Sequence, residues 1–234
     1  NSIIIAPSSL DYKITKCPRC FYLDKKLKIA VDSYPPPVFS NFDVVQQNYF
    51  KNLNTKKLSE KLPSGKIMTK SELPGRVVSK EMQDSKGRKF ILGGRPDIVI
   101  KFDDGSYGII DFKTTQLSDD KADNYKYQLE SYAQIFLNPG ATKTAPTPKL
   151  DPISQIGVLQ FFPSEIFDHE KDNCKLNFKM SYVKLNRDVN DFYKRVELYI
   201  DIVSKENPPD YSDNCKDCNF AKTQKSMKWI RINT

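Results

Sequence analysis

The stretch of sequence that decides the fold reads Gly94-Arg95-Pro96-Asp97, followed at positions 111–115 by Asp111-Phe112-Lys113-Thr114-Thr115. Each motif lies in a segment whose alternating apolar residues predict a β-strand. The turn signal Asp103-Asp104-Gly105 predicts that the two strands, 97–102 and 107–114, form one hairpin. The two motifs are therefore expected to lie side by side.

Such a hairpin brings the carboxyl groups of Asp97 and Asp111 to one point. Two close carboxylates form a hard oxygen site that suits Mg²⁺ or Mn²⁺. Lys113 follows Asp111 by two residues, so its side chain projects from the same face of the strand. Its ammonium group can hold an attacking water or offset charge on a phosphate oxygen. The three residues thus have the chemistry of metal-assisted phosphodiester hydrolysis.

A helix is expected next, from a cap at Ser118 to about Leu137. Its apolar face is formed by Tyr125, Leu129, Tyr132 and Phe136. Gln128 and Tyr132 are four residues apart and share one face, where an amide and a phenol can hydrogen-bond the metal site or a nucleotide. The alternative is that Gln128 is an ordinary polar residue on the surface and Tyr132 an aromatic residue of the core. The order of all three motifs favours the functional interpretation.

The rest of the chain completes a mixed α/β pattern of helix, strands, helix, strands and helix. Further helices are expected over about 40–62, with Phe42, Val45, Tyr49 and Leu53 on one face, and over 186–203. Further strands are expected over 76–82, 89–92, 153–162 and 175–184. A proline turn is expected at 34–37 and an exposed loop at 139–152.

Four of the five cysteines form two C-x-x-C pairs, Cys17 with Cys20 and Cys215 with Cys218. Because the first ten residues lack a secretory signal, the pairs predict a four-thiolate metal site rather than disulfides. The spacing lets both sulfurs of a pair converge on one ion or cluster. Uncoordinated thiols or a redox disulfide are the alternative. Cys174 stands alone and is expected to bind no metal.

The composition favours a polyanionic partner. The chain has 37 Lys and Arg against 29 Asp and Glu, a net charge of +8, which favours nucleic acid first and acidic membrane surfaces second. Lysines near 51–70, 143–149 and 222–228 are placed to follow a phosphate backbone. No apolar run approaches a membrane span, and 38% hydrophobic residues exclude a disordered chain. The absent signal and reduced thiols predict a cytoplasmic location.

In this order, the G-R-P-D, D-F-K-T-T and Q-L-E-S-Y runs resemble the RecB-like exonuclease branch of the PD-(D/E)XK nuclease superfamily. The segment from Ser8 through Cys20 to Leu23 also looks like that branch. The C-terminal cysteines are similar to those of its iron–sulfur members, including the exonucleases of CRISPR adaptation. The resemblance implies a restriction-endonuclease-like core, a mixed β-sheet flanked by helices. It implies one domain over 1–234, with a core at about 40–206 and cysteine-bearing ends, 8–30 and 207–234, joined by the metal site.

The resemblance also implies roles for the motif residues. Asp97 and Asp111 would bind Mg²⁺ or Mn²⁺, with the backbone carbonyl of Phe112 as a further ligand. Lys113 would position or activate the water. Gln128 and Tyr132 would support the metal site and contact DNA. The four cysteines would hold an iron–sulfur cluster.

Two departures from the family pattern stand out. The family has a His or Glu on the helix before the first core strand, whereas the single histidine here, His169, comes too late in the chain. That helix offers Gln46 and Gln47, and its nearest acids are Asp43 and Glu60, so weak or restricted activity is expected. Iron–sulfur members also have one early and three late cysteines rather than two and two. Zinc is therefore an alternative to the cluster.

Three functions follow from these patterns. The first is a metal-dependent deoxyribonuclease, expected to be an exonuclease on single strands or duplex ends in repair, recombination or defence, with protein partners in such a complex. The second is a catalytically weak or inactive DNA-binding module that retains the nuclease fold. The third is a protein-interaction domain that zinc stabilises and in which the Asp-x-Lys motif occurs by chance. Metal-dependent cleavage separates the first from the other two, and salt-sensitive DNA binding without cleavage identifies the second.

Overall fold

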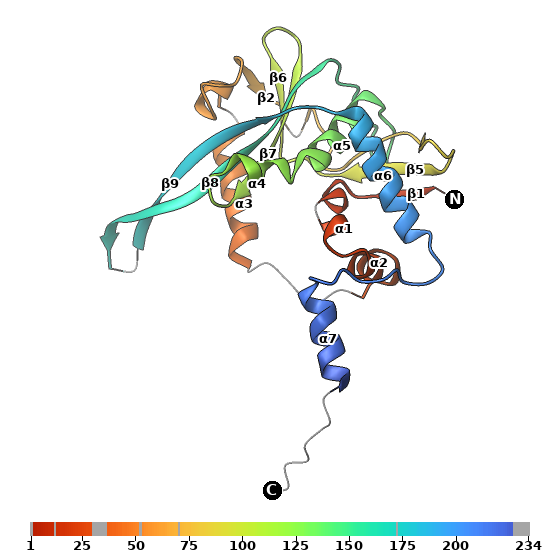
Figure 1. The fold of residues 1–234 in the computed structure, drawn as a ribbon. Coiled ribbons are helices and arrows are strands. Elements are labelled where there is room, and N and C mark those ends of the chain that lie inside the picture. Colours follow the sequence, from red (N-terminus) through yellow and green to blue (C-terminus); the bar gives the residue numbers. More distant parts are fainter. Residues whose placement is uncertain are drawn as a thin grey trace, which may run out of the picture.

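The computed structural model describes residues 2–11, 13–29, 37–51, 53–69, 71–171 and 173–226. They form a mixed α/β fold in which helices cover both faces of a curled mixed sheet, as expected (Figure 1). The expected proline turn falls mainly on 34–36, and the last basic stretch runs past 226, so both lie partly outside the described residues. Among the described residues, none of the helices has the length and apolarity that a membrane crossing requires.

The main sheet has five strands in the order β2-β6-β7-β8-β9. These strands are β2 (Gly65–Ile67), β6 (Ile98–Phe102), β7 (Tyr107–Thr114), β8 (Ile153–Glu170) and β9 (Asn173–Leu185). β7 and β8 run parallel, while the other neighbours run antiparallel. A parallel pair needs a crossover connection, and here it contains α4 (Asp119–Asp123) and α5 (Lys126–Leu137).

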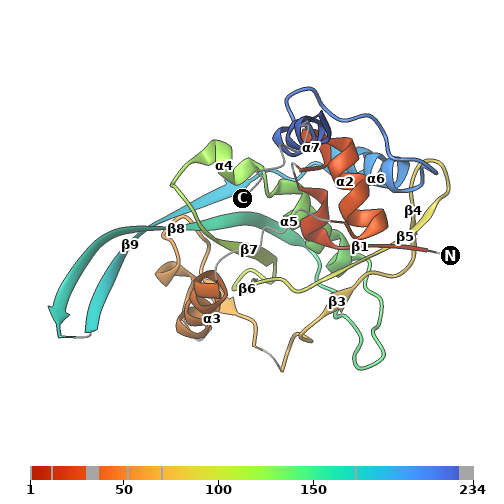
Figure 2. The same cartoon turned by 90° about the horizontal axis from the view of Figure 1, so that it is seen from below.

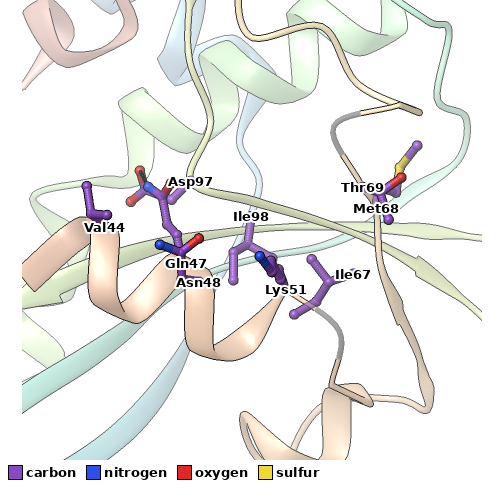
Figure 3. Close-up of a pocket in the computed structure, with 9 residues that line it drawn as sticks. All are labelled: Val44, Gln47, Asn48, Lys51, Ile67, Met68, Thr69, Asp97 and Ile98. Carbon is purple, nitrogen blue, oxygen red and sulfur yellow. Dashed lines mark hydrogen bonds between the residues drawn. The ribbon is translucent and has the colours of Figure 1, made fainter.

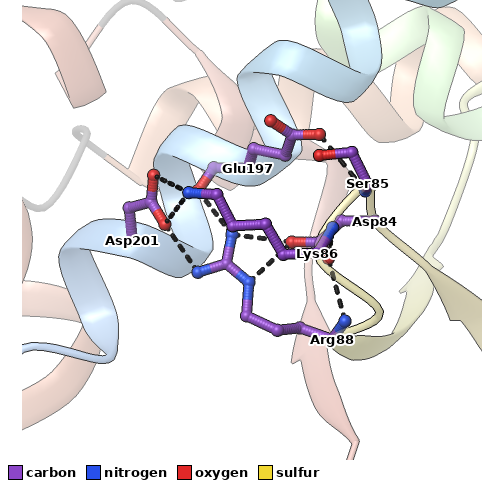
Figure 4. Close-up of polar contacts among 6 residues, drawn as sticks. All are labelled: Asp84, Ser85, Lys86, Arg88, Glu197 and Asp201. Atoms are coloured by element: carbon purple, nitrogen blue, oxygen red, sulfur yellow. Dashed lines mark hydrogen bonds and ion pairs between the residues drawn. The ribbon is translucent and has the colours of Figure 1, made fainter.

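A smaller sheet is built around β5 (Lys89–Gly94). Its other strands are β1 (Ile3–Ile5), β3 (Val77–Val78) and β4 (Met82–Gln83), all of which pair with β5. The β4–β5 turn is tied to α6 (Val189–Val203) by ion pairs (Figure 4). Arg88 contacts both Asp84, at 2.6 Å, and Asp201, at 2.6 Å. These ion pairs fix the small sheet against α6, which shares one layer of helices with α5.

Two apolar cores lie on opposite faces of the main sheet. One contains α5, α6 and the N-terminal elements η1 (Pro7–Leu10), α1 (Lys13–Lys16) and α2 (Pro18–Leu27). The other lies under α3 (Pro37–Phe50), where the Phe50 ring meets Phe112 edge-on at 5.7 Å. Ile109 joins the first core and Ile110 the second, as strand alternation requires. β7, the strand of the D-F-K-T-T motif, is therefore held from both sides.

Helix α3 is shorter than the apolar spacing of its sequence predicts. The expected helix over 40–62 is wrong: α3 ends at Phe50, and a 3-10 turn, η2 (Thr55–Lys57), follows because the Asn54 side chain caps it at Lys56 N. The expected apolar face is confirmed only for Phe42, whose ring contacts Phe178, and for Leu53, which packs against the core under α3. Val45 and Tyr49 are 64% and 69% exposed, and Gln46 and Phe50 face the core instead.

Three other elements differ from the expectation. The helix over 118–137 breaks at Asn124 into α4 and α5, although Ser118 caps its start as predicted. The strand expected over 76–82 splits into β3 and β4, because Ser79 bridges to Pro139 between them. The β8–β9 hairpin is longer than expected, and its outer half extends away from the body (Figures 1 and 2). The final described helix is α7 (Lys216–Ser226).

Candidate functional site

The β6–β7 hairpin brings the two predicted carboxylates together. Ile98 lies opposite Ile110, so the adjoining residues, Asp97 and Asp111, come face to face at the end of the ladder. The backbone N–H of Phe112 donates to Asp97 Oδ2 at 2.9 Å, which fixes the Asp97 side chain against β7. The turn that makes this possible has Gly105 at φ 86°, a conformation that favours glycine.

Asp111 is the most buried of the charged residues at this site, at 3% exposure. Its Oδ1 accepts a hydrogen bond of 2.8 Å from Gln128 Nε2 on α5. Its Oδ2 lies 2.5 Å from Lys113 Nζ, but in the described part of the chain no aligned hydrogen bond reaches that oxygen. Lys113 Nζ in turn lies over the Tyr125 ring, 4.9 Å from its centroid. Asp97, Asp111, Lys113 and Gln128 thus form one cluster.

The charges in this cluster perturb one another. Burial and the neighbouring charge of Asp111 raise the pKa of Asp97 to about 7, although the Phe112 N–H and Lys113 oppose the shift. Burial also raises the pKa of Asp111, against the effect of Lys113. Burial lowers the pKa of Lys113, but the two carboxylates outweigh it and the net shift is upward. The site holds more negative charge than Lys113 neutralises.

These features fit a hard divalent cation. Asp111 Oδ2 is a buried carboxylate oxygen without an aligned donor, and a second carboxylate faces it across the hairpin. A cation between them would offset the repulsion that raises the pKa of Asp97. Carboxylate oxygens are also the ligands that Mg²⁺ and Mn²⁺ prefer. The residues present therefore suit the ion that the sequence predicts.

Helix α3 adds two polar residues to the cluster. Gln47 Nε2 lies 3.5 Å from Asp97 Oδ1. Asp43, one turn earlier, has a pKa raised by burial and by the charge of Asp97, while Lys113 opposes the shift. From the sequence, Gln47 and Asp43 are only candidates for the place on this helix where the family has a His or Glu. The i, i+4 spacing of Asp43 and Gln47 is the signal that identifies them.

Tyr132 supports the loop that leads into Asp97. Its hydroxyl donates to the Arg95 carbonyl at 2.7 Å, and the side chain is only 5% exposed. A Cβ at Gly94 would lie 2.9 Å from that hydroxyl, so the close approach requires glycine at this position. Burial and the charges of Asp111 and Asp97 raise the pKa of Tyr132. The close packing of Tyr132 therefore explains why the G-R-P-D motif has glycine at position 94.

The four paired cysteines meet as the sequence predicts. Cys17 and Cys20 lie at the start of α2, and Cys215 and Cys218 lie at the start of α7. The Sγ atoms are 3.8 Å apart for Cys17 and Cys218, and all four lie within 4.8 Å of one another. Cys174 is exposed on β9 and is not part of the group. The N- and C-terminal regions are thus joined at a potential metal site.

The sulfur separations suit a single tetrahedral ion. Four thiolates about 2.3 Å from one Zn²⁺ lie about 3.8 Å apart. Cys20 Sγ lies 3.5 Å from Cys215 Sγ and 3.4 Å from Cys218 Sγ, close to that value. Burial raises the pKa of Cys20 and that of Cys218, so a bound cation would be needed to hold all four as thiolates.

Comparisons with known proteins agree with this fold. A family model described as the PD-(D/E)XK nuclease superfamily matches residues 54–223, which include both carboxylates, Lys113 and Gln128. The chain is also similar to a solved structure titled "Crystal structure of SSO0001", with a TM-score of 0.53 and 17% identity over 95% of this chain and 85% of that one. At that identity the likeness shows a shared fold. No curated protein matches the sequence.

Proposed function

Because this chain belongs to the PD-(D/E)XK nuclease superfamily, we propose that it is a metal-dependent deoxyribonuclease. The observation that carries the proposal is the hairpin pair of Asp97 and Asp111, with Lys113 Nζ 2.5 Å from Asp111. The substrate class rests on the family, and the net charge of +8 favours a polyanion. The family resemblance of the motifs points further, to exonuclease action on DNA ends in repair, recombination or defence.

Asp97, Asp111 and the backbone carbonyl of Phe112 would hold Mg²⁺ or Mn²⁺. When bound, the ion would polarise a phosphoryl oxygen and lower the pKa of a water. Lys113 would orient that water and offset the charge that develops on the phosphate. The raised pKa of Lys113 keeps its ammonium group protonated, which suits an electrostatic role better than that of a base.

The surrounding residues would position this machinery. Gln128 holds Oδ1 of Asp111, and Oδ2, which lies 2.5 Å from Lys113 Nζ, would be shared between Lys113 and the cation. Asp43 would supply the acid that the family usually takes from a His or Glu, with Gln47 beside it. Tyr132 is buried, so we assign it to the Arg95 backbone rather than to direct contact with DNA.

For the cysteine site we propose Zn²⁺ in preference to an iron–sulfur cluster. The cysteines of a cluster are divided among different irons, which spreads the sulfurs farther apart than a single ion does. Three of the separations are 3.4–3.8 Å and all four sulfurs lie within 4.8 Å of one another, which supports the single ion. Metal analysis of purified protein is expected to give one zinc per chain. Stoichiometric iron with visible absorbance would establish the cluster. The reduced thiols suit the cytoplasm.

The test of the nuclease uses end-labelled single-stranded and duplex DNA with Mg²⁺, Mn²⁺ or EDTA. Wild type is expected to digest DNA only with a metal, and Asp111→Asn and Lys113→Ala are expected to lose digestion. Asp103→Asn, an exposed acid of the same hairpin, and Lys101→Ala, an exposed lysine of β6, are matched controls that should digest normally. The product ladder identifies the end attacked.

The DNA-binding module is the second candidate, and the missing His or Glu on α3 favours it. No digestion by the wild type under any metal, with salt-sensitive DNA binding intact, would establish the module in place of the nuclease.

A further inference from the structure

A cavity of about 420 Å³ opens directly beside the carboxylate site, and Asp97 forms part of its wall (Figure 3). α3 contributes one side, and the segment from Ile67 to Thr69 contributes the other. This volume lies in the range of pockets that hold a small organic ligand, roughly 300–1,000 Å³. The family match and the proposed mechanism leave this cavity without an assigned ligand.

The cavity combines an apolar floor with a polar rim. Val44, Ile67 and Ile98 provide aliphatic surface, which suits the flat face of a nucleobase. Lys51, which directly follows the end of α3 at Phe50, provides a cation at the rim. Thr69, on the opposite side, adds a hydroxyl. Aliphatic burial beside a positive charge matches a nucleoside with its phosphate better than it matches a wholly apolar ligand.

The position of the cavity relates it to the reaction. Asp97 is shared by the carboxylate pair and the cavity, and Gln47, which contacts Asp97, also lines the cavity. A phosphodiester held at Asp97 and Asp111 would therefore place its neighbouring nucleoside at the cavity mouth. Lys51 would then meet the next phosphate along the strand.

We infer that this cavity binds the nucleoside next to the scissile phosphate in an unpaired state, so that single-stranded DNA is the preferred substrate. This inference rests on the proposed nuclease function. A base held between α3 and the segment 67–69 has protein on both sides, where its complementary base would have to lie. Duplex ends would have to fray before they could be cut.

The first test blocks the cavity and measures DNA binding in EDTA, so that cleavage plays no part. Val44→Trp places an indole in the cavity from a position that is 57% exposed. Val45→Trp is the matched control, since Val45 is the next residue of α3, 64% exposed, and does not line the cavity. Fluorescence anisotropy is expected to show about tenfold weaker binding of a single-stranded oligonucleotide by Val44→Trp only.

The second test removes the base or the cation. One abasic nucleotide, moved stepwise along the oligonucleotide, is expected to weaken wild-type binding at one position and to leave Val44→Trp unaffected. Lys51→Ala is expected to reduce the salt dependence of binding by about one ion, and Lys57→Ala, an exposed lysine of η2, serves as its control.

The inference is overturned if Val44→Trp and Val45→Trp bind DNA alike, or if duplex and single strands bind and are cut equally. Preference for single-stranded RNA over the matching DNA would also overturn it. A wild type that binds single strands through the cavity but never cleaves would instead refute the proposed nuclease, so the two failures are distinguishable.

Discussion

The carboxylate site and the cysteine site are assembled in opposite ways. Asp97 and Asp111 lie on adjacent strands of one hairpin, and β7 is packed on both faces. Cys20 and Cys215 meet across 195 residues of chain, at the starts of two helices on the periphery of the fold. The two carboxylates are positioned by the backbone register of the hairpin. The cysteines depend instead on the bond or bound ion that joins their sulfurs.

This difference predicts different responses to damage. A site positioned by a sheet keeps its geometry when one side chain is neutralised, so it loses chemistry before it loses structure. A site that closes a long loop contributes to folding through that closure, so it loses structure when its metal is removed.

The largest effect is expected from Asp111→Asn. Cleavage should fall at least about a thousandfold, because the variant removes a charged metal ligand from a buried site. Thermal stability should be unchanged or slightly higher, since the uncharged amide no longer carries the cost of a buried carboxylate. Steady-state cleavage and a melting curve on the same sample measure both. A fall in melting temperature of more than a few degrees would contradict positioning by the sheet alone.

The next effect is expected from Cys218→Ser. Loss of one thiolate should release the metal and destabilise the protein by about 3 kcal/mol, with protease cutting confined first to the regions around α2 and α7. Cys174→Ser is the control, because Cys174 is exposed and stands outside the group. Limited proteolysis with mass spectrometry gives the cut sites. Equal protease resistance in both variants would show that the cluster does not secure the two ends.

A pH effect is expected when metal is absent. The pKa of Asp97 is raised to about 7 by burial and by Asp111, against about 3.9 in the unfolded chain. The folded state therefore binds more protons than the unfolded state between these values, and stability falls as pH rises through that window and levels off above about 7.

We expect the free energy of unfolding to fall by about 2 kcal/mol across this pH window. This is less than the full pKa shift of Asp97 would give, because Asp97 is partly exposed. Melting curves in EDTA between pH 4.5 and 8 measure it. Asp97→Asn should flatten this dependence, and a wild-type curve that rises over the same window would have the wrong sign.

The smallest effect is expected on α3. Asp43→Asn should lower cleavage about tenfold, because Asp43 contributes charge at the edge of the site rather than at its centre. Tyr49→Ala, on the same helix and 69% exposed, is the control and should cleave normally. Metal titration of the activity separates weaker metal binding from slower chemistry. An effect as large as that of Asp111→Asn would make α3 an equal part of the site.

The sequence was sufficient to predict which of these side chains meet, because their spacing is encoded locally. Asp97, Asp111 and Lys113 follow from strand alternation and one turn, and the C-x-x-C pairs follow from thiol spacing. The mixed α/β order was also predictable from periodicity.

Other features depend on tertiary contacts that local patterns do not contain. Gln46, a polar residue, is buried while Val45 and Tyr49 face outward, so hydrophobic spacing alone indicated the wrong side of α3 at these three positions. The approach of Asp43 to Asp97 depends on how that helix lies across β6 and β7. The length of the β8–β9 hairpin was missed because its outer half buries little.

The joining of the chain ends has a consequence in the order of biosynthesis. At about 5–20 residues per second, a ribosome needs roughly 10–40 s to proceed from Cys20 to Cys215, which lies 195 residues later. The carboxylate hairpin is complete well before the second thiol pair emerges. Capture of the proposed metal by the four cysteines would then be the last event. A chain that stops before Cys215 would carry Asp97 and Asp111 but could not join its two ends. The four-cysteine cluster can therefore form only in a chain that has been synthesised past Cys218.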